Sequence, residues 1–153
     1  AGKARPFRGP GPFLGLTGIS LWGDRKSPAP ARLREAWARL DTDCLLLLMP
    51  LERAVGYDGE GDFDPDAEGR LGRRLPGRRG AHVFAGCYLA SPRLFADAPE
   101  GPFSTNILWD RAIAKGRLHG LAHDGLWLHV GTPDAIGLAE RALARSASNH
   151  GRP

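Results

Sequence analysis

Hydrophobic residues are spaced in two ways along this chain, and the two spacings predict its elements. Apolar runs of strand length between glycine, proline or polar residues predict strands at residues 13–22, 43–49, 82–90 and 126–130. Alternating positions predict a further strand at residues 117–123. Apolar positions three and four apart predict helices at residues 31–40, 105–115 and 134–145. Phe63 and Leu71 flank a turn, which predicts a β-hairpin over residues 61–73.

The order of these elements predicts an α/β fold. Strand, helix and strand follow one another over residues 13–49, which is typical of a right-handed βαβ unit, and the leucine run within 43–49 predicts a strand covered on both faces. We expect a mixed, mainly parallel sheet flanked by helices, with a small β-hairpin. The domain is expected to span residues 13–145, between a basic Gly/Pro-rich segment (1–12) and a flexible tail (146–153).

Composition is that of a globular protein with many turns. The 153 residues are 42% hydrophobic and 25% charged, and they include 21 glycines and 13 prolines. No apolar stretch approaches the roughly 20 residues of a membrane span, and the first twelve residues lack the apolar core of a secretory signal. The sequence therefore predicts a cytoplasmic protein without a membrane partner. Cys44 and Cys87 lie in apolar runs, which favours buried free cysteines over a disulfide or a metal pair.

Positive charge gathers in one predicted loop. The formal net charge is +4, and residues 73–79 contribute four arginines to it. Such a loop is consistent with a nucleic-acid patch or with a solvated loop that attracts phosphorylated small molecules. Because few aromatic residues are interleaved and no recognition-helix pattern is present, the sequence favours the solvated loop.

An acidic run at residues 58–66 invites comparison with a calcium loop. Counted from Asp62, the sixth position is Ala67, where an EF-hand needs glycine, and the twelfth is Arg73, where it needs glutamate. The run is therefore not an EF-hand. Asp62 and Asp64 could bind a divalent ion, but carboxylates beside a hairpin turn are more often solvated.

The strand at 126–130 stops abruptly at Gly131, Thr132 and Pro133, which supply a turn, a capping hydroxyl and a proline for the first helical position. A polar side chain at such a strand end faces the crevice beyond the sheet, and His129 is the candidate. A zinc site is the alternative for this histidine with two others, but no motif with zinc-ligand spacing supports it. The two other histidines are His119 and His123.

Five motifs in order resemble the bacterial sugar-1-phosphate nucleotidyltransferases, in the branch of N-acetylmuramate-1-phosphate uridylyltransferase and mannose-1-phosphate guanylyltransferase. They are residues 45–57, 61–63 (Gly-Asp-Phe), 84–86 (Phe-Ala-Gly), 106–114 and 125–135. The resemblance runs from about residue 11 to 143 and implies a truncated, Rossmann-like nucleotidyltransferase fold. It also implies a reaction that joins a nucleoside triphosphate to a sugar 1-phosphate with release of pyrophosphate, assisted by Mg²⁺.

The resemblance implies particular site residues. Gly61 and Gly86 would bring backbone amides close to the sugar phosphate and the sugar ring, which glycine allows because it has no side chain. Asp62 would flank that contact. Trp127 is expected to pack in the core and Thr132 to cap a helix.

Magnesium ligands are less well matched. The family has one metal-binding aspartate where this chain has Ile19, and a second carboxylate where it has His129. A neutral imidazole is a poor ligand for a hard cation, which leaves Asp24 in the following loop as the remaining carboxylate candidate.

The family's glycine-rich nucleotide loop has no counterpart among these residues. The resemblance therefore implies the sugar-phosphate-binding half of the enzyme, with a partner chain or preceding segment supplying the nucleotide site. The second hypothesis is a non-catalytic module that binds sugar 1-phosphates or nucleotide sugars, or that pairs with a relative or a second copy through an exposed sheet edge.

Overall fold

The computed structural model describes residues 11–17, 20–25 and 27–149. The strands are β1 (Phe13–Leu16), β2 (Ser20–Gly23), β3 (Cys44–Pro50), β4 (Phe63–Pro65), β5 (Leu71–Arg73), β6 (His82–Ala90), β7 (Leu118–Ala122) and β8 (Leu126–His129). The helices are α1 (Ala29–Trp37), α2 (Thr105–Ala114) and α3 (Pro133–Asn149), with short 3-10 turns η1 (Leu51–Arg53) and η2 (Pro92–Phe95).

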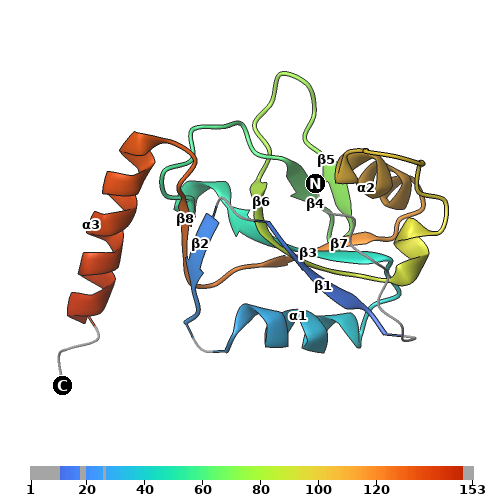
Figure 1. Cartoon of the computed structure of the whole chain (residues 1–153), viewed down its shortest axis with the longest axis horizontal. Coiled ribbons are helices and arrows are strands. Elements are labelled where there is room, and N and C mark those ends of the chain that lie inside the picture. Colours follow the sequence, from blue (N-terminus) through green and yellow to red (C-terminus); the bar gives the residue numbers. More distant parts are fainter. Residues whose placement is uncertain (1–10, 18–19, 26, 150–153) are drawn as a thin grey trace.

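Two sheets organise these elements (Figure 1). The larger sheet has the order β5-β4-β6-β3-β7, and β1 also pairs with β6. Strand β3 pairs along one edge of β6, so β4 and β1 share the other edge. On that edge, β4 pairs with β6 at His82, and β1 pairs with residues 87–90. The smaller sheet consists of β2 and β8, with Ser20 opposite His129 at one end and Gly23 opposite Leu126 at the other.

The mixed α/β architecture is confirmed, but the expected mainly parallel sheet is wrong. In the described residues only β3 and β7 pair in parallel, and the other strand pairs are antiparallel. The predicted strand at 13–22 divides into β1 and β2, which join different sheets. Strands β1 and β3 both run antiparallel to β6 and flank it, so the expected βαβ unit is split by a strand from later in the chain.

Helices cover both faces of the larger sheet, with α1 below it and α2 above it in Figure 1. Leu45, Leu47 and Met49 of β3 pack in the core on the α1 side. Leu46 and Leu48 pack in the core on the α2 side. Residues 44–49 of β3 are at most 1% exposed, which confirms the prediction from the leucine run. Both cysteines are free and buried, as expected.

Most element boundaries agree with the hydrophobic pattern, including the hairpin of β4 and β5 and the capping of α2, where Ser104 Oγ accepts a hydrogen bond from Asn106 N. The last helix is longer than predicted. Helix α3 continues to Asn149 and so includes residues 146–149, the first part of the expected tail. The rest of that tail and most of the basic segment 1–12 lie outside the described residues. None of the described helices is both long and apolar enough to cross a membrane.

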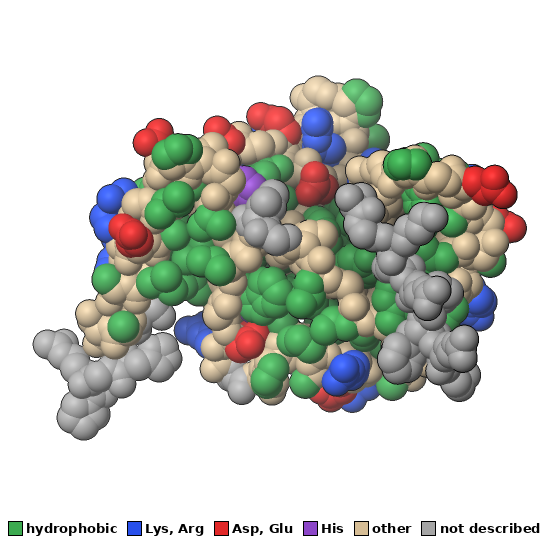
Figure 2. All heavy atoms as spheres, in the orientation of Figure 1, with side chains coloured by type: hydrophobic (Ala, Val, Ile, Leu, Met, Phe, Trp, Pro, Cys, Tyr) green, Lys and Arg blue, Asp and Glu red, His purple; other side chains and the backbone are tan. Residues whose placement is uncertain are grey.

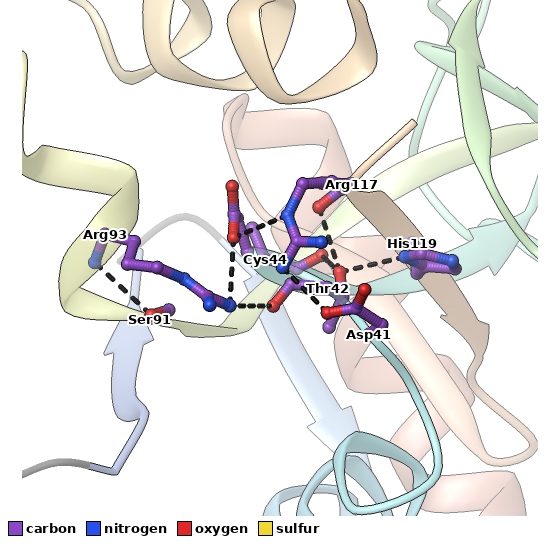
Figure 3. Close-up of polar contacts among 8 residues, drawn as sticks. Asp41, Thr42, Cys44, Ser91, Arg93, Arg117 and His119 are labelled. Carbon is purple, nitrogen blue, oxygen red and sulfur yellow. Dashed lines mark hydrogen bonds and ion pairs between the residues drawn. The ribbon is translucent and has the colours of Figure 1, made fainter. Parts of the chain in front are cut away.

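A polar cluster fixes the starts of β3 and β7 (Figure 3). The Arg117 guanidinium lies between two carboxylates, 2.9 Å from Asp41 Oδ1 and 2.9 Å from Asp43 Oδ1, and these carboxylates raise its pKa. Thr42 Oγ1 lies 2.9 Å from two backbone carbonyl oxygens and therefore donates its hydrogen to them. His119 Nδ1, at 2.8 Å, must then donate to Thr42 Oγ1, which fixes the histidine ring in place.

This cluster makes stability depend on pH. Burial lowers the pKa of His119, which is 6% exposed. The unfolded chain therefore binds a proton more readily than the folded chain, so we expect the free energy of unfolding to fall as pH decreases below about 6.5. Urea unfolding at a series of pH values above and below about 6.5 measures the slope of the free energy of unfolding against pH. His119→Gln should reduce it, and an identical slope in the variant would contradict the assignment.

Candidate functional site

The three predicted sugar-phosphate residues lie along one edge of β6, in the gap between β4 and β1. Asp62 N donates to His82 O at 2.8 Å, and Asp62 Oδ2 accepts from Phe84 N at 2.9 Å. Two residues further on, Gly86 O accepts from Thr17 N at 2.8 Å. The structure thus places Asp62 beside Phe84, two residues from Gly86, and the Asp62 carboxylate acts as an anchor for the β6 backbone.

Both glycines need a backbone conformation that other residues rarely adopt. Gly61 has a φ of +79°, and Gly86 has a φ of +95°. A Cβ on Gly61 would lie 2.9 Å from Gly80 O, and a Cβ on Gly86 would lie 3.1 Å from Thr17 Oγ1. Gly86 also lies where the register between β3 and β6 shifts. The fold therefore requires glycine at both positions before any ligand is considered.

Three rings stand beside this edge. The Tyr57 and His129 ring centroids lie 5.7 Å apart with planes at 87°, and the Trp127 and His129 centroids lie 6.0 Å apart. Tyr57 Oη accepts a hydrogen bond from Gly61 N at 3.3 Å, and Trp127 Nε1 donates to Ala85 O at 3.0 Å. Burial raises the pKa of Tyr57, so its phenol stays protonated at neutral pH.

Sequence reasoning missed two of these roles. Trp127 packs in the core as expected, but it also holds the β6 backbone next to Gly86 through its indole nitrogen. Tyr57 stands four residues before Gly61 and accepts a hydrogen bond from its amide, a role that no sequence pattern predicted. A buried tryptophan needs a hydrogen-bond partner for its N–H. The predicted burial of Trp127 could therefore have indicated that its indole nitrogen binds a backbone carbonyl.

His129 lies at the site end of the smaller sheet, as expected for a polar residue at a strand end. Its backbone N donates to Val55 O at 2.9 Å, and its register partner is Ser20. Ser20 Cβ lies 3.8 Å from where a Cβ on Gly86 would be, so the register partner of His129 approaches Gly86. Within the described ranges, neither ring nitrogen of His129 is hydrogen-bonded to the protein.

The carboxylates of the described residues do not fit a magnesium site with His129. Asp24 Oδ1 accepts a hydrogen bond from Ala29 N at 2.9 Å, at the start of α1. Asp24 also follows the far end of β2, about 13 Å along the strand from Ser20 at 3.3 Å per residue, so it cannot share an ion with His129. Mg²⁺ requires closely packed oxygen ligands in octahedral geometry. Ile19, the other position implied by the resemblance, lies outside the described residues.

The three histidines considered for zinc have separate environments. His119 binds Thr42, whereas His123 Nε2 lies 3.0 Å from Gly23 O and 3.1 Å from Leu126 O. His129 lies against Tyr57. In the part of the chain that the structure describes, no three His, Cys, Asp or Glu side chains are placed to hold a metal ion.

The basic loop is partly engaged by the protein itself. Arg73 Nε lies 2.8 Å from Asp110 Oδ1, and its guanidinium covers the Phe63 ring at 4.8 Å from the centroid. Arg79 lies 3.8 Å from Glu60. A hollow of about 430 Å³ lies next to this loop, and it includes none of the predicted sugar-phosphate residues. It is lined by Pro50, Leu51, Glu52, Arg79, Gly80, Ala81 and His82.

Comparison with known proteins decides the relationship. The chain is 34% identical over 138 residues to N-acetylmuramate alpha-1-phosphate uridylyltransferase of Caulobacter vibrioides, a match that covers 90% of this chain and 57% of the relative. This chain matches a portion of a sugar-1-phosphate nucleotidyltransferase. It spans little more than half the length of that relative, and no protein-family model matches it.

Solved structures support the same fold. A protein from Bacillus anthracis assigned as a glucose-1-phosphate thymidylyltransferase, in complex with sucrose, superposes with a TM-score of 0.63 at 17% identity and covers 90% of this chain and 56% of its own. HddC from Yersinia pseudotuberculosis, complexed with GMP-PN, gives a TM-score of 0.61 at 19% identity, over 86% of this chain and 55% of its own. The expected nucleotidyltransferase-like fold is therefore confirmed for the matched portion.

Proposed function

We propose that this chain binds a sugar 1-phosphate at Gly61, Asp62 and Gly86, and that N-acetylmuramate 1-phosphate is the ligand. One observation carries the proposal: two buried left-handed glycines and an anchored carboxylate lie where β6 passes between β4 and β1, and the ring of Tyr57 links Gly61 to His129. The name of the curated relative supplies the sugar. Backbone groups beside glycine can come close to a ligand, which suits hydrogen bonding to sugar hydroxyls and phosphate oxygens.

In a nucleotidyl transfer, a phosphate oxygen of the sugar 1-phosphate attacks the α-phosphorus of the nucleoside triphosphate, and pyrophosphate leaves. The proposed part of this chain is to hold the attacking phosphate in place. The backbone at Gly86 and the His129 ring would contact the phosphate, while Trp127 keeps the β6 backbone in position. We propose that a partner chain or a further segment supplies the nucleotide site, so the isolated chain does not turn over.

Calorimetric titration of this chain with N-acetylmuramate 1-phosphate tests the proposal. Because the described carboxylates do not fit a magnesium site, we expect the same affinity in EDTA and in Mg²⁺. We also expect that adding UTP to the chain with its bound sugar 1-phosphate releases no pyrophosphate. Gly61→Ala should abolish the heat of binding because its Cβ meets Gly80 O, whereas Gly77→Ala, with no atom within 4 Å of its Cβ, should retain it. Absence of heat with the unmodified chain would overturn the proposal.

The alternative function, a pairing module, has its own observation. Strand β1 pairs with β6 alone among the described residues, which leaves one β1 edge without a described partner strand. Leu16 and Leu21 are 61% and 51% exposed, and Figure 2 shows hydrophobic side chains gathered on the face that carries β1, β2 and α3. The proposed partner is a second copy or the chain that carries the nucleotide site, and light scattering of the isolated chain tests the first of these.

A further inference from the structure

The loop between β7 and β8 has an unusual set of hydrogen-bond partners. Five successive backbone carbonyls, from residue 122 to residue 126, lie within hydrogen-bond distance of three basic side chains. The Arg53 guanidinium donates hydrogen bonds to the middle three carbonyls, at 3.4 Å to His123 O, 2.9 Å to Asp124 O and 3.2 Å to Gly125 O. Arg32 donates to Ala122 O at 3.2 Å, and His123 Nε2 reaches Leu126 O at 3.1 Å.

The three donors come from different parts of the fold. Arg32 belongs to α1, Arg53 ends η1, and His123 belongs to the loop itself. Arg32 also pairs with Asp124 at 3.1 Å. His123 is 1% exposed, and its Nε2 faces Gly23 O as well as Leu126 O, so this nitrogen must carry the hydrogen. The loop is thereby tied to α1, to the end of β3 and to β2.

These contacts stand where the chain changes sheets. Strand β7 runs beside β3 in the larger sheet, and β8 begins four residues later beside β2 in the smaller one. The carbonyls of residues 123–125 lie between the two strands, and water would satisfy them in an ordinary surface loop. Guanidinium donors from fixed elements instead hold the backbone in one geometry, because each planar fork bonds in set directions.

Strand β8 carries two residues of the candidate site. Trp127 follows the loop directly after Leu126 and donates to Ala85 O, one residue before Gly86. His129 lies two residues beyond Trp127. A small shift of β8 would therefore change the distance between His129 and the β6 edge, and would loosen the indole hydrogen bond.

We propose that Arg32, Arg53 and His123 form a carbonyl clamp that positions Trp127 and His129 against Gly86. The clamp residues are positioning residues and do not contact the ligand. The link to ligand binding rests on the proposed function, whereas the positioning of Trp127 does not.

The test is Arg53→Ala, with Arg39→Ala as the matched control. The Arg39 side chain lies in the turn after α1 and pairs only with Glu35 of that helix in the described residues, and both side chains are at least 70% exposed. NMR of the Trp127 indole N–H, without ligand, reports the hydrogen bond to Ala85 O. For Arg53→Ala we expect a shifted indole resonance, lost protection from hydrogen exchange, and about tenfold weaker binding of N-acetylmuramate 1-phosphate. Arg39→Ala should change none of these.

Chemical rescue separates positioning from a general loss of stability. Millimolar methylguanidinium should restore the indole resonance and the affinity in Arg53→Ala and leave the unmodified chain unchanged. If Arg53→Ala does not fold, Arg53→Lys replaces it, with a partial shift expected because an ammonium cannot reproduce the guanidinium fork. An unchanged Trp127 resonance in a folded variant overturns the clamp. If the unmodified chain binds no sugar phosphate, the proposed function fails while the resonance still decides the clamp.

Discussion

Gly125→Ala is expected to destabilise the chain more than any other single methyl addition described here. A Cβ at this position would lie 1.9 Å from Gly23 O, a backbone atom, and 3.1 Å from His123 Nε2. No side-chain rotation relieves the first contact, so β2 and β8 must separate. Forced overpacking costs about 1–3 kcal/mol in typical cores, and we expect at least the upper end of that range here. Urea unfolding followed by tryptophan fluorescence measures the loss.

Gly23→Ala is the control for that experiment. Gly23 is in the same small sheet, but its added Cβ would meet only Leu126 Cβ, at 3.8 Å, which is an ordinary contact. We expect a change within about 0.5 kcal/mol, the range of most surface substitutions. Equal stability of the two variants would show that the loop at Gly125 can move away, and it would weaken the case for a fixed geometry between the sheets.

Trp127→Phe is expected to damage both stability and binding. The phenylalanine keeps most of the apolar contact but removes the N–H that donates to Ala85 O, in a side chain that is 1% exposed. A buried carbonyl left without its partner costs about 1–3 kcal/mol, and the smaller ring leaves unfilled volume. Together we expect about 3 kcal/mol less stability. Because the β6 backbone beside Gly86 loses its anchor, affinity for the sugar 1-phosphate should fall about tenfold or more.

The control here is Trp22→Phe. Trp22 stands opposite Trp127 in the β2–β8 ladder, is only half-buried, and has no indole hydrogen bond among the described contacts. We expect the smaller stability loss of a trimmed ring, about 1 kcal/mol, and an unchanged affinity. If both variants lose affinity equally, packing of the small sheet, and not the bond to Ala85 O, controls the site.

The candidate site depends on residues that support the backbone more than on side chains that reach a ligand. A carboxylate oxygen of Asp62 accepts a hydrogen bond from Phe84 N, and the Trp127 indole N–H donates one to Ala85 O. These contacts hold the β6 backbone around Gly86 and the segment before β4 that carries Gly61. Side chains fixed by packing and hydrogen bonds hold such a backbone more precisely than a loop would. The predicted residues are accordingly two glycines without side chains and an aspartate whose carboxylate is already hydrogen-bonded to Phe84 N.

The sequence by itself determined most of the local structure. Apolar runs located β3, β6 and β8, and helical spacing located α1, α2 and most of α3, because each element must bury one face or both. The glycines at Gly61 and Gly86 were also identified from their motifs, and the structure shows that both need a left-handed backbone. The relationship to a nucleotidyltransferase followed from the same motifs and is confirmed by the matched relative.

The tertiary structure alone decided which strands pair, how carboxylates are used and what holds β8. Periodicity shows which face of a strand is buried but not which neighbour covers its edge, so β6 between β1 and β3 could not be foreseen. Asp24 was a metal candidate by residue type, and its hydrogen bond to Ala29 N appears only once β2 and α1 meet. The clamp of Arg53 on three carbonyls joins residues about seventy positions apart in sequence, a distance across which no local pattern carries information.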